Sequence, residues 1–293
     1  MVQHPALSPE AVAAFTTRLG AGPTSLRAAD GGAAGRHDGN ARDANAPGVA
    51  EWEAADIAAA EVAALAGTLS VDAALVPAGS RLADYRLLAF DMDSTLITIE
   101  CIDEIADYAG RKAEVAAITE AAMRGEITNF ADSLRRRVAL LAGLEQSVLE
   151  RVFDERLRLS PGATELLAAA RRQGLTTLLV SGGFTYFTER LRTQLGLDHA
   201  RANNLEVVDG RLTGKVLGRI LDADGKARAL QEVCSAIGCH PGEAVALGDG
   251  ANDLKMMALA GVSVAYHAKP VVRAQTTFAI SWCGLDAVLN LLP

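Results

Sequence analysis

The sequence predicts an α/β fold, a doubly wound, Rossmann-like parallel sheet with a helical cap and a small α/β appendage. Short apolar runs alternate with helical segments along residues 161–293, and this alternation is typical of a parallel sheet with helices on both faces. A stretch that is helical throughout, residues 100–160, follows the first strand of the pattern. We therefore expect an appendage at 1–83, a core at 84–99 and 161–293, and a cap at 100–160.

The appendage is expected to hold two helices, a short strand and a flexible insert. Ser8 precedes a proline and suits the N-cap of a first helix. A second helix is predicted at 51–66 and a short strand at 71–76. Residues 26–48 carry almost no large apolar side chain, so their burial cannot offset the entropy lost on ordering. That stretch is predicted to be a long loop or a flexible insert.

The first core strand is predicted at 85–90, a mostly apolar run typical of a buried parallel strand. Apolar positions at helical spacing, with glycines at the breaks, then predict the helices of the cap. The predicted cap helices are 101–109, 111–124, 130–141 and 146–157.

From residue 161 strands and helices alternate again, and an Asp209-Gly210 turn between two short runs predicts a β-hairpin. The predicted core helices are 164–173, 184–195, 226–237 and 254–260, and the predicted strands are 175–180, 205–208, 211–217, 244–247, 262–265 and 278–281.

Composition and charge limit the classes of partner. Half of the residues are hydrophobic and only 4% are aromatic, so the core is expected to be built from Ala, Leu and Val. A net charge of −8 disfavours nucleic acid or an anionic membrane as the main partner, while a homo-oligomer is left open. There is no apolar stretch of roughly 18 residues and no secretory signal, so we expect a cytoplasmic protein. The four cysteines lack metal-ligand spacing and are expected to be structural thiols.

Carboxylates and small polar residues follow the predicted strands where each strand ends. Asp91 and Asp93 come directly after the strand at 85–90, and Ser181 follows the strand at 175–180. The carboxyl ends of parallel strands meet at the edge where open α/β sheets bind ligands. Because such residues also cluster in ordinary turns, the Asp-x-Asp pair alone does not identify a site.

Two further elements point to phosphoryl transfer. Lys226 begins a predicted helix, and Asp249 lies in a glycine-rich loop after the strand at 244–247. Phosphoryl transfer is catalysed mainly by positioning and by neutralising charge on the phosphate oxygens. A lysine and a hard cation both supply positive charge, and Mg²⁺ prefers a few carboxylates with phosphate and water oxygens. Asp91 and Asp249 are therefore the best ligand candidates.

In order and spacing, these elements resemble the motifs of the haloacid dehalogenase-like superfamily. The matching segments are Asp91-Met92-Asp93-Ser94-Thr95, Ser181-Gly182, Lys226 and Gly248-Asp249-Gly250-Ala251-Asn252-Asp253. The resemblance implies that Asp91 is a covalent nucleophile, forming an aspartyl-phosphate, and that Asp93 is the general acid and base. It also implies Mg²⁺ held by Asp91, Asp249 and the backbone carbonyl of Asp93. Asp253 is expected to be an outer ligand or to orient water, unless it only stabilises a helix N-terminus.

The phosphate group of the substrate is expected to meet four further residues. The hydroxyl of Ser181 and the backbone N–H of Gly182 suit phosphate oxygens, and Lys226 adds positive charge. Asn252 is expected to shape the last loop beside the substrate.

The helical insertion narrows the resemblance to the bacterial phosphoserine phosphatases, over about residues 84–293. The segments that carry it are Met123-Arg124-Gly125-Glu126, Ser133-Leu134-Arg135-Arg136-Arg137-Val138, Ser181-Gly182-Gly183-Phe184 and Ala265-Tyr266-His267-Ala268-Lys269-Pro270. The resemblance implies hydrolysis of O-phospho-L-serine to L-serine and phosphate, the last step of serine biosynthesis.

Four residues of the insertion are expected to bind the amino-acid part of this substrate. Glu100 is a suitable partner for the ammonium, and Arg137 can hold the carboxylate with two hydrogen bonds. Met123 and Phe130 would exclude water when the cap closes. The family pattern has one residue fewer between Gly125 and Phe130, so the place of Phe130 is less well determined than that of Arg137.

Three other functions remain to be separated from this one. A phosphotransferase would move the phosphoryl group from phosphoserine to another alcohol, and phosphate release without an acceptor distinguishes the two. A non-catalytic sensor of phosphorylated ligands, acting through residues 1–83, is disfavoured by the intact set of catalytic residues. A broad phosphomonoesterase would have no need of Glu100 and Arg137.

Overall fold

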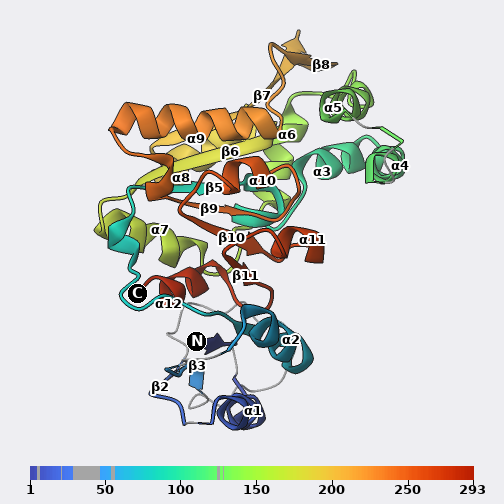
Figure 1. Cartoon of the computed structure of the whole chain (residues 1–293). Coiled ribbons are helices and arrows are strands. Elements are labelled where there is room, and N and C mark those ends of the chain that lie inside the picture. Colours follow the sequence, from blue (N-terminus) through green and yellow to red (C-terminus); the bar gives the residue numbers. More distant parts are fainter. Residues whose placement is uncertain (5–6, 21, 29–46, 54–56, 124–125, 128) are drawn as a thin grey trace.

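The computed structural model describes the chain except at residues 5–6, 21, 29–46, 54–56, 124–125 and 128 (Figure 1). Its main sheet has seven strands in the order β11-β10-β9-β5-β6-β7-β8, and every neighbouring pair except β7 and β8 is parallel. The α/β class with a parallel core is therefore confirmed. The strands are β5 (Leu87–Phe90), β6 (Thr176–Phe184), β7 (His199–Val208), β8 (Arg211–Leu217), β9 (Ala244–Gly248), β10 (Val262–Tyr266) and β11 (Phe278–Ile280).

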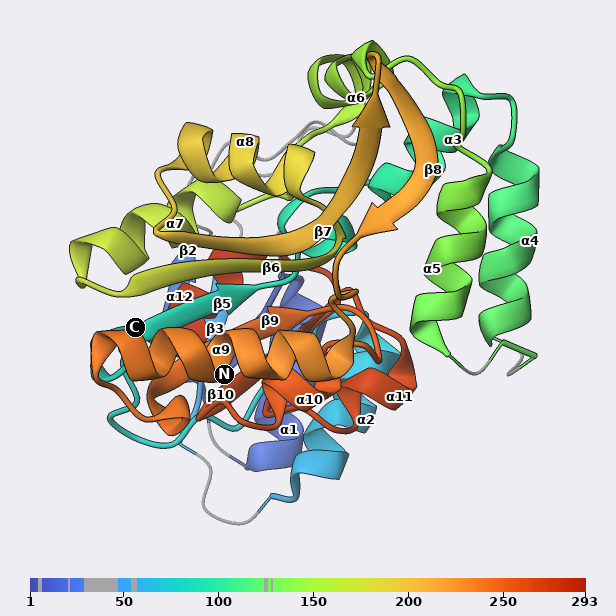
Figure 2. The same ribbon diagram turned by 90° about the horizontal axis from the view of Figure 1, so that it is seen from above.

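Strand β5 is the central strand of this sheet, and both of its faces are covered by apolar clusters. Leu87 and Ala89 join the apolar cluster under α9 and α10, while Leu88 and Phe90 join the cluster under α7 and α8. Figure 2 shows these two helix layers on either side of the strands. The core helices are α7 (Ala163–Arg172), α8 (Thr185–Leu195), α9 (Ala223–Ile237), α10 (Leu254–Met257), α11 (Pro270–Arg273) and α12 (Val288–Leu291).

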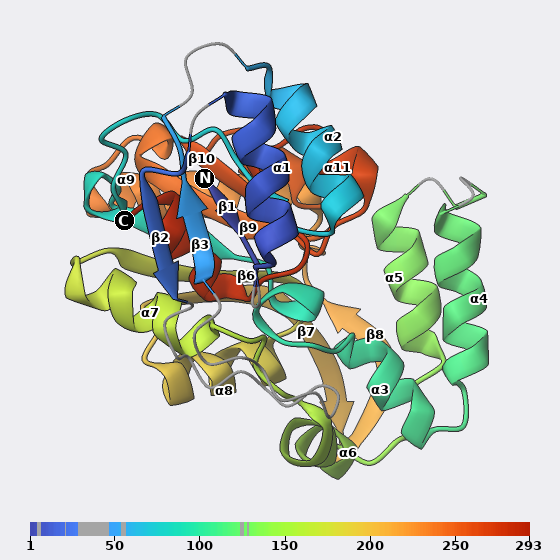
Figure 3. The same ribbon diagram turned by 90° about the horizontal axis from the view of Figure 1, so that it is seen from below.

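The helical insertion between β5 and β6 stands beside the sheet, with α4 and α5 side by side in Figures 2 and 3. Its predicted helices are present with shifted ends, and the last becomes a π-type turn before residue 157. They are α3 (Cys101–Tyr108), α4 (Lys112–Met123), α5 (Phe130–Ala139), α6 (Ser147–Arg151) and η3 (Val152–Arg156). The division of the chain into appendage, core and cap stays a prediction.

The first part of the chain folds around a second, antiparallel sheet, at the bottom of Figure 1. Its strand order is β2-β3-β1-β4. The elements are β1 (Val2–Gln3), α1 (Pro9–Leu19), β2 (Ser25–Ala28), β3 (Pro47–Glu51), α2 (Ala59–Leu69) and β4 (Asp72–Ala73). Ser8 caps α1 as predicted, because its Oγ accepts a hydrogen bond from Ala11 N at 3.1 Å.

Three expectations for this part were wrong in their limits. The second helix begins at Ala59 rather than at residue 51, because residues 47–51 pair with β1 and β2 as a strand. The flexible insert predicted at 26–48 has a strand at each end, β2 and β3, which pair with each other. Its centre, at 29–46, lies outside the described residues. The strand predicted at 71–76 is reduced to Asp72–Ala73.

Several predicted limits in the core also shift, for local reasons. Strand β6 continues through Ser181–Phe184, and β7 begins at His199 rather than at 205. Helix α9 begins before Lys226, because Asp222 Oδ1 caps it by accepting from Gly225 N at 2.8 Å. The β-hairpin is confirmed, with positive φ at both turn residues, Asp209 and Gly210. The remaining short turns are η1 (Leu82–Asp84), η2 (Met92–Leu96), η4 (Pro241–Glu243) and η5 (Leu285–Ala287).

The two sheets are joined by a buried carboxylate. Asp72 Oδ1 accepts a hydrogen bond from Ser281 N at 2.6 Å, and Oδ2 accepts from Trp282 N and Cys283 N at 3.1 and 2.9 Å. This contact ties β4 to the segment after β11, so the two parts of the chain share a polar junction. Of the helices in the described part of the chain, none is long and apolar enough to cross a membrane.

Candidate active site

The polar residues predicted at strand ends meet at the carboxyl edge of the main sheet. Asp91 follows β5, Ser181 and Gly182 lie in the last part of β6, and Asp249 follows β9. Strand β5 pairs with both β6 and β9, so these loops are neighbours. Lys226 reaches the same place from the first turns of α9.

The chain turns sharply after Asp91, which turns the following hydroxyls toward other site residues. Ser94 has a φ of 56°, a left-handed conformation uncommon for serine, within the π-type turn η2. Its Oγ donates to Glu100 Oε1 at 2.7 Å, and Thr95 Oγ1 donates to Asp249 Oδ1 at 3.4 Å. The turn therefore connects the first motif to both the insertion and the last loop.

Lys226 lies at the centre of the site with 1% of its surface exposed. Its Nζ donates to Asp91 Oδ1 at 2.6 Å and to Asp253 Oδ1 at 2.7 Å. Burial lowers the pKa of the ammonium, but the carboxylates of Asp253 and Asp91 together raise that pKa above its ordinary value. Lys226 is therefore a fixed positive charge against two buried carboxylates.

Three carboxylates gather closely enough to hold a cation. One oxygen each of Asp91, Asp249 and Asp253 lies within 4.8 Å of the others. Burial, and then repulsion by Asp253, raises the pKa of Asp91 well above its usual value and the pKa of Asp249 to about 6. The single ammonium of Lys226 leaves this repulsion incompletely balanced. A set of hard carboxylate oxygens with uncompensated charge fits Mg²⁺.

Asp93 is not part of this cluster and is held by two donors. Its Oδ1 accepts from Cys101 N, at the start of α3, at 2.9 Å, and its Oδ2 accepts from Ser181 Oγ at 3.2 Å. Burial raises the pKa of Asp93 above its usual value. A Cβ at Gly183 would lie 2.8 Å from Asp93 Oδ2, so the close approach of this carboxylate requires glycine there.

A cavity of about 140 Å³ opens between the insertion and the ends of the strands. Glu100 and Arg137 line it from the insertion, and Asp91 and Asp249 line it from the loops after the strands. Phe130 closes it against β6, since a Cβ at Gly182 would lie only 3.0 Å from Phe130 Cζ. The full lining is Asp91, Asp93, Glu100, Ile102, Phe130, Leu134, Arg137, Gly182, Gly183, Phe184, Asp249 and Asn252.

The two charged residues of the insertion lose water where they line the cavity, although Glu100 as a whole stays exposed and Arg137 is half-buried. Burial, and then repulsion by Asp93, raises the pKa of Glu100 to about 8. Burial lowers the pKa of Arg137 below its ordinary value. Among the residues that the structure describes, the buried Arg137 Nε has no hydrogen-bond partner. A group that is buried and lacks a partner is suited to receive one from a ligand.

Nearly all of the predicted site residues converge here, Phe130 included, in spite of the extra residue before it. The exception is Met123, which ends α4 and whose side chain lies outside the described residues. Sequence reasoning missed the apolar lining by Ile102, Leu134 and Phe184. The only signal for Ile102 and Leu134 was their place on the apolar face of a predicted helix, which is equally typical of core residues.

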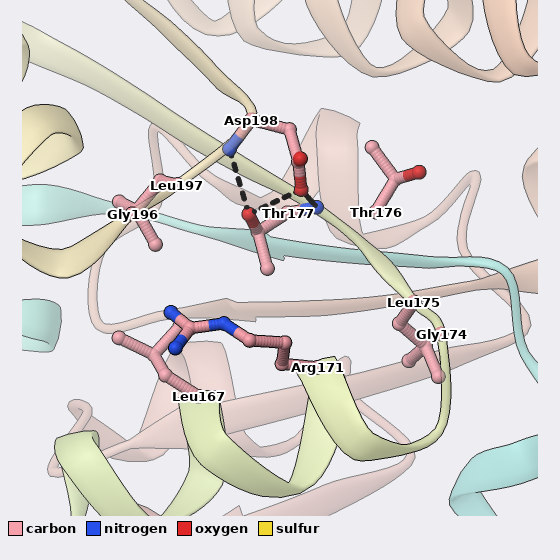
Figure 4. A pocket seen from close by; sticks show the side chains of 9 residues that line it. All are labelled: Leu167, Arg171, Gly174, Leu175, Thr176, Thr177, Gly196, Leu197 and Asp198. Atoms are coloured by element: carbon pink, nitrogen blue, oxygen red, sulfur yellow. Dashed lines mark hydrogen bonds between the residues drawn. The ribbon is translucent and has the colours of Figure 1, made fainter.

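Two other cavities in the described part of the chain have a different lining. The pocket in Figure 4 lies at the opposite, amino end of β6. Its polar groups pair with each other or with backbone: Thr177 Oγ1 bonds to Asp198 Oδ2 at 2.8 Å, and Arg171 donates to Leu195 O at 2.8 Å. A larger cavity of about 800 Å³, beside the N-terminal sheet, is lined by apolar residues such as Phe15 and Trp52.

Comparison with known proteins agrees with this geometry. A family model described as haloacid dehalogenase-like hydrolase matches residues 88–258. A phosphoserine phosphatase of Polaromonas sp. is 57% identical over 216 residues, which are 72% of this chain and 92% of that relative. The probable phosphoserine phosphatase from Vibrio cholerae, in unliganded form, has a TM-score of 0.78 at 36% identity and covers 99% of this chain and 85% of its own. A phospho-aspartyl intermediate analogue of phosphoserine phosphatase has a TM-score of 0.67 at 39% identity, over 71% of this chain and 99% of its own.

The fold, the acidic strand-end site and the matched family model define a haloacid dehalogenase-like hydrolase. The matched range contains the strand-end motifs at Asp91 and at Asp249, which supply the carboxylate cluster. Identity above 50% to a curated relative along almost its whole length then places the chain in the phosphoserine phosphatase family of these hydrolases.

Proposed function

We propose that this protein hydrolyses O-phospho-L-serine to L-serine and inorganic phosphate through an aspartyl-phosphate on Asp91. The observation that carries the proposal is that Glu100 and Arg137 line the same small cavity as Asp91. The phosphoryl-transfer centre therefore has an acidic and a basic side chain beside it. These suit the ammonium and the carboxylate of an amino-acid phosphate. The relatives named phosphoserine phosphatase support the same substrate.

Asp91 is the nucleophile in this proposal. Its carboxylate forms the bond to phosphorus, and the serine oxygen leaves. The hydrogen bond from Lys226 Nζ, at 2.6 Å, orients the carboxylate and brings a positive charge to the phosphoryl oxygens. The N–H of Gly182, which lines the cavity, binds one of the remaining phosphate oxygens. Ser181 Oγ, whose proton is donated to Asp93 in this structure, turns to another phosphate oxygen when the substrate is bound.

Asp93 moves the protons. Its carboxyl group gives a proton to the leaving serine oxygen and later takes one from the water that hydrolyses the aspartyl-phosphate. The donors Cys101 N and Ser181 Oγ hold the carboxyl group in place. Because burial raises the pKa of Asp93, its protonated form is more accessible than that of an exposed aspartate.

The metal is proposed to be Mg²⁺, held by Asp91, Asp249 and the backbone carbonyl of Asp93. When bound, it neutralises the carboxylates and polarises a phosphoryl oxygen. Asp253 is better suited to an outer role, because its oxygens already accept from Lys226 Nζ at 2.7 Å and from Gly250 N at 3.1 Å.

The amino-acid part of the substrate is proposed to bind the insertion. Glu100, held by Ser94 Oγ at 2.7 Å, receives the ammonium, which would lower the raised pKa of this glutamate toward its usual value. Arg137 receives the carboxylate and thereby pairs its buried Nε. Phe130, packed on Gly182, keeps water from the reacting atoms. The water-excluding role of Met123, the cytoplasmic location and the place at the end of serine biosynthesis stay predictions.

A substrate panel tests the proposal directly. Phosphate release is measured with and without Mg²⁺ from O-phospho-L-serine, O-phospho-D-serine and p-nitrophenyl phosphate, with no alcohol acceptor added. We expect Mg²⁺-dependent release that favours O-phospho-L-serine, and a loss of at least about a thousandfold in Asp91→Asn. Release only in the presence of an alcohol would indicate a phosphotransferase. Equal rates on the aryl phosphate would indicate a broad phosphomonoesterase.

A further inference from the structure

Strand β6 breaks its ladder with β7 where it enters the active site. The pairing runs regularly to Val180 opposite Arg201 and resumes at Phe184 opposite Asn203. Between these two pairs, β6 has three residues, 181–183, whereas β7 has one, Ala202. A bulge of this kind leaves backbone groups without their ladder partners and redirects the bulged residues, which here form the proposed phosphate-binding loop.

The side chain of Asn203 replaces one of the lost contacts. This residue is 2% exposed, and its Nδ2 donates to the carbonyl oxygen of Gly182 at 2.8 Å. The contact fixes the peptide unit between Gly182 and Gly183. The N–H of that same peptide donates to Ser181 Oγ at 2.8 Å, and Ser181 Oγ donates to Asp93 Oδ2 at 3.2 Å. A continuous series of hydrogen bonds thus runs from Asn203 to the proposed acid and base.

The other end of the same amide holds a second loop of the site. Asn203 Oδ1 accepts a hydrogen bond from Leu221 N at 2.7 Å. The next residue, Asp222, is the N-cap of α9, and its carbonyl oxygen accepts from Lys226 N at 2.8 Å. The position of Leu221 therefore determines where the helix that carries Lys226 begins.

We propose that Asn203 is a positioning residue for the phosphate, which sets the phosphate-binding loop at 181–183 and the start of the lysine helix relative to each other. Asn203 lies outside the cavity lining and acts through its neighbours. The primary amide carries its donor and its acceptor on two separate atoms that point to different loops. The carboxylate of aspartate has no donor, and serine has one oxygen on a shorter side chain, so neither can make both contacts in the same way. The inference rests on the proposed function, because it assigns these loops to the phosphate.

The test compares Asn203→Ala with a matched control on the full-length protein with Mg²⁺. The control is Asn204→Ala, the next asparagine on the same strand, which is exposed and accepts from Thr185 Oγ1. The measurements are kcat and KM for O-phospho-L-serine and for p-nitrophenyl phosphate, the inhibition constant of inorganic phosphate, and the melting temperature. Rates are expressed per folded protein, by circular dichroism.

For Asn203→Ala we expect kcat to fall about tenfold or more, by a similar factor for both esters, because a buried polar group is left unpaired beside the phosphate that they share. The inhibition constant of inorganic phosphate should rise, and Asn204→Ala should leave all of these values unchanged. Asn203→Ser, which is smaller and neutral, provides the second variant if the alanine variant does not fold, and the same pattern is expected.

Two results would overturn the inference. One is full activity and unchanged phosphate inhibition in the folded variants. The other is a lower melting temperature with kcat per folded protein and the inhibition constant both unchanged, which would show a purely structural residue. If the natural protein releases phosphate from another ester but not from phosphoserine, the proposed function fails, and the same comparison on that ester still tests Asn203.

Discussion

Three consecutive arginines on α5 differ in burial, and this decides which of them can serve the site. Arg135 and Arg136 are exposed, and Arg136 forms an ion pair with Asp132 at 2.8 Å on the same helix. Arg137 lines the cavity and keeps a buried Nε unpaired among the described residues. A run of three arginines is by itself typical of a solvated helix face, and only the resemblance to the phosphoserine phosphatases singled out Arg137 in the sequence. The tertiary structure separates them, because Arg137 lies on the side of α5 that lines the cavity, whereas Arg135 and Arg136 lie on the side exposed to solvent.

Arg137→Ala is therefore expected to weaken binding of the substrate carboxylate. The KM for O-phospho-L-serine should rise by roughly ten- to a hundredfold. This factor corresponds to the loss of about 1.5–3 kcal/mol of binding free energy, which is typical of hydrogen bonds to a charged group. The KM for p-nitrophenyl phosphate should change little, because this ester has no carboxylate. Steady-state kinetics on the two esters measures the difference.

Arg136→Ala is the matched control, since it removes an exposed ion pair worth about 0–1 kcal/mol. Both KM values should stay near those of the natural protein. An equal rise in KM for both esters in Arg137→Ala would show that this arginine does not bind the substrate carboxylate.

At the scale of elements, the contact between α5 and β6 depends on the absence of a side chain. A Cβ at Gly182 would lie 3.0 Å from Phe130 Cζ, tighter than ordinary contact. The first residue of α5 therefore rests directly on the backbone of the phosphate loop. The helix, the strand end and the cavity between them form one packed unit, in which a single methyl group would displace the ring.

Gly182→Ala is expected to lower kcat/KM by about tenfold or more, since misplacement of the ring and loop by even part of an ångström disturbs near-attack geometry. In a double-mutant cycle, Phe130→Leu should reduce that loss, because the shorter side chain leaves room for the methyl group. Gly67→Ala, in the last turn of α2 with no atom within 4 Å of the added Cβ, is the control and should stabilise the protein by up to about 1 kcal/mol. Additive losses in the cycle would contradict the proposed contact.

At the scale of the whole molecule, one carboxylate joins the N-terminal sheet to the core. Asp72 is buried and accepts three backbone N–H groups from residues 281–283, and a second contact joins Asn290 Nδ2 to Gln3 Oε1 at 3.0 Å. These residues are more than 200 positions apart in the chain. The junction therefore forms only in the assembled fold. It lies beside β11, the edge strand of the main sheet.

Asp72→Asn is expected to lower stability, because its amide presents N–H groups where acceptors are needed. The loss should be about 2–3 kcal/mol, or several degrees in the melting temperature by calorimetry. The kcat per folded protein should be nearly unchanged, since Asp72 does not line the active-site cavity. Asp84→Asn provides a control, because Asp84 is exposed and its contacts are local, an ion pair with Arg81 at 2.9 Å and a hydrogen bond from Arg81 N at 3.1 Å. A melting temperature equal to that of the natural protein would show that the junction contributes nothing.

Local patterns predicted the main features of this protein because those features are local in origin. The parallel sheet follows from short apolar runs alternating with helices, and the hairpin follows from Asp209-Gly210. The site could be placed because each polar motif comes directly after a strand, and strand ends of a parallel sheet meet at one edge. The start of α2 was misplaced because residues 47–51 pair with β1 and β2, which no helical periodicity reveals.

By itself, therefore, the sequence determined the α/β class, the motif residues Asp91, Asp93, Ser181, Lys226 and Asp249, and the chemistry that such groups can perform. Only the tertiary structure decided which partners these groups take. It paired Lys226 with Asp253, placed Arg137 on the wall of the cavity and joined Asn203 to Gly182. The physical reason is that apolar periodicity and turn chemistry act between near neighbours in the chain, whereas hydrogen bonds and ion pairs in a buried site join segments brought together only by packing.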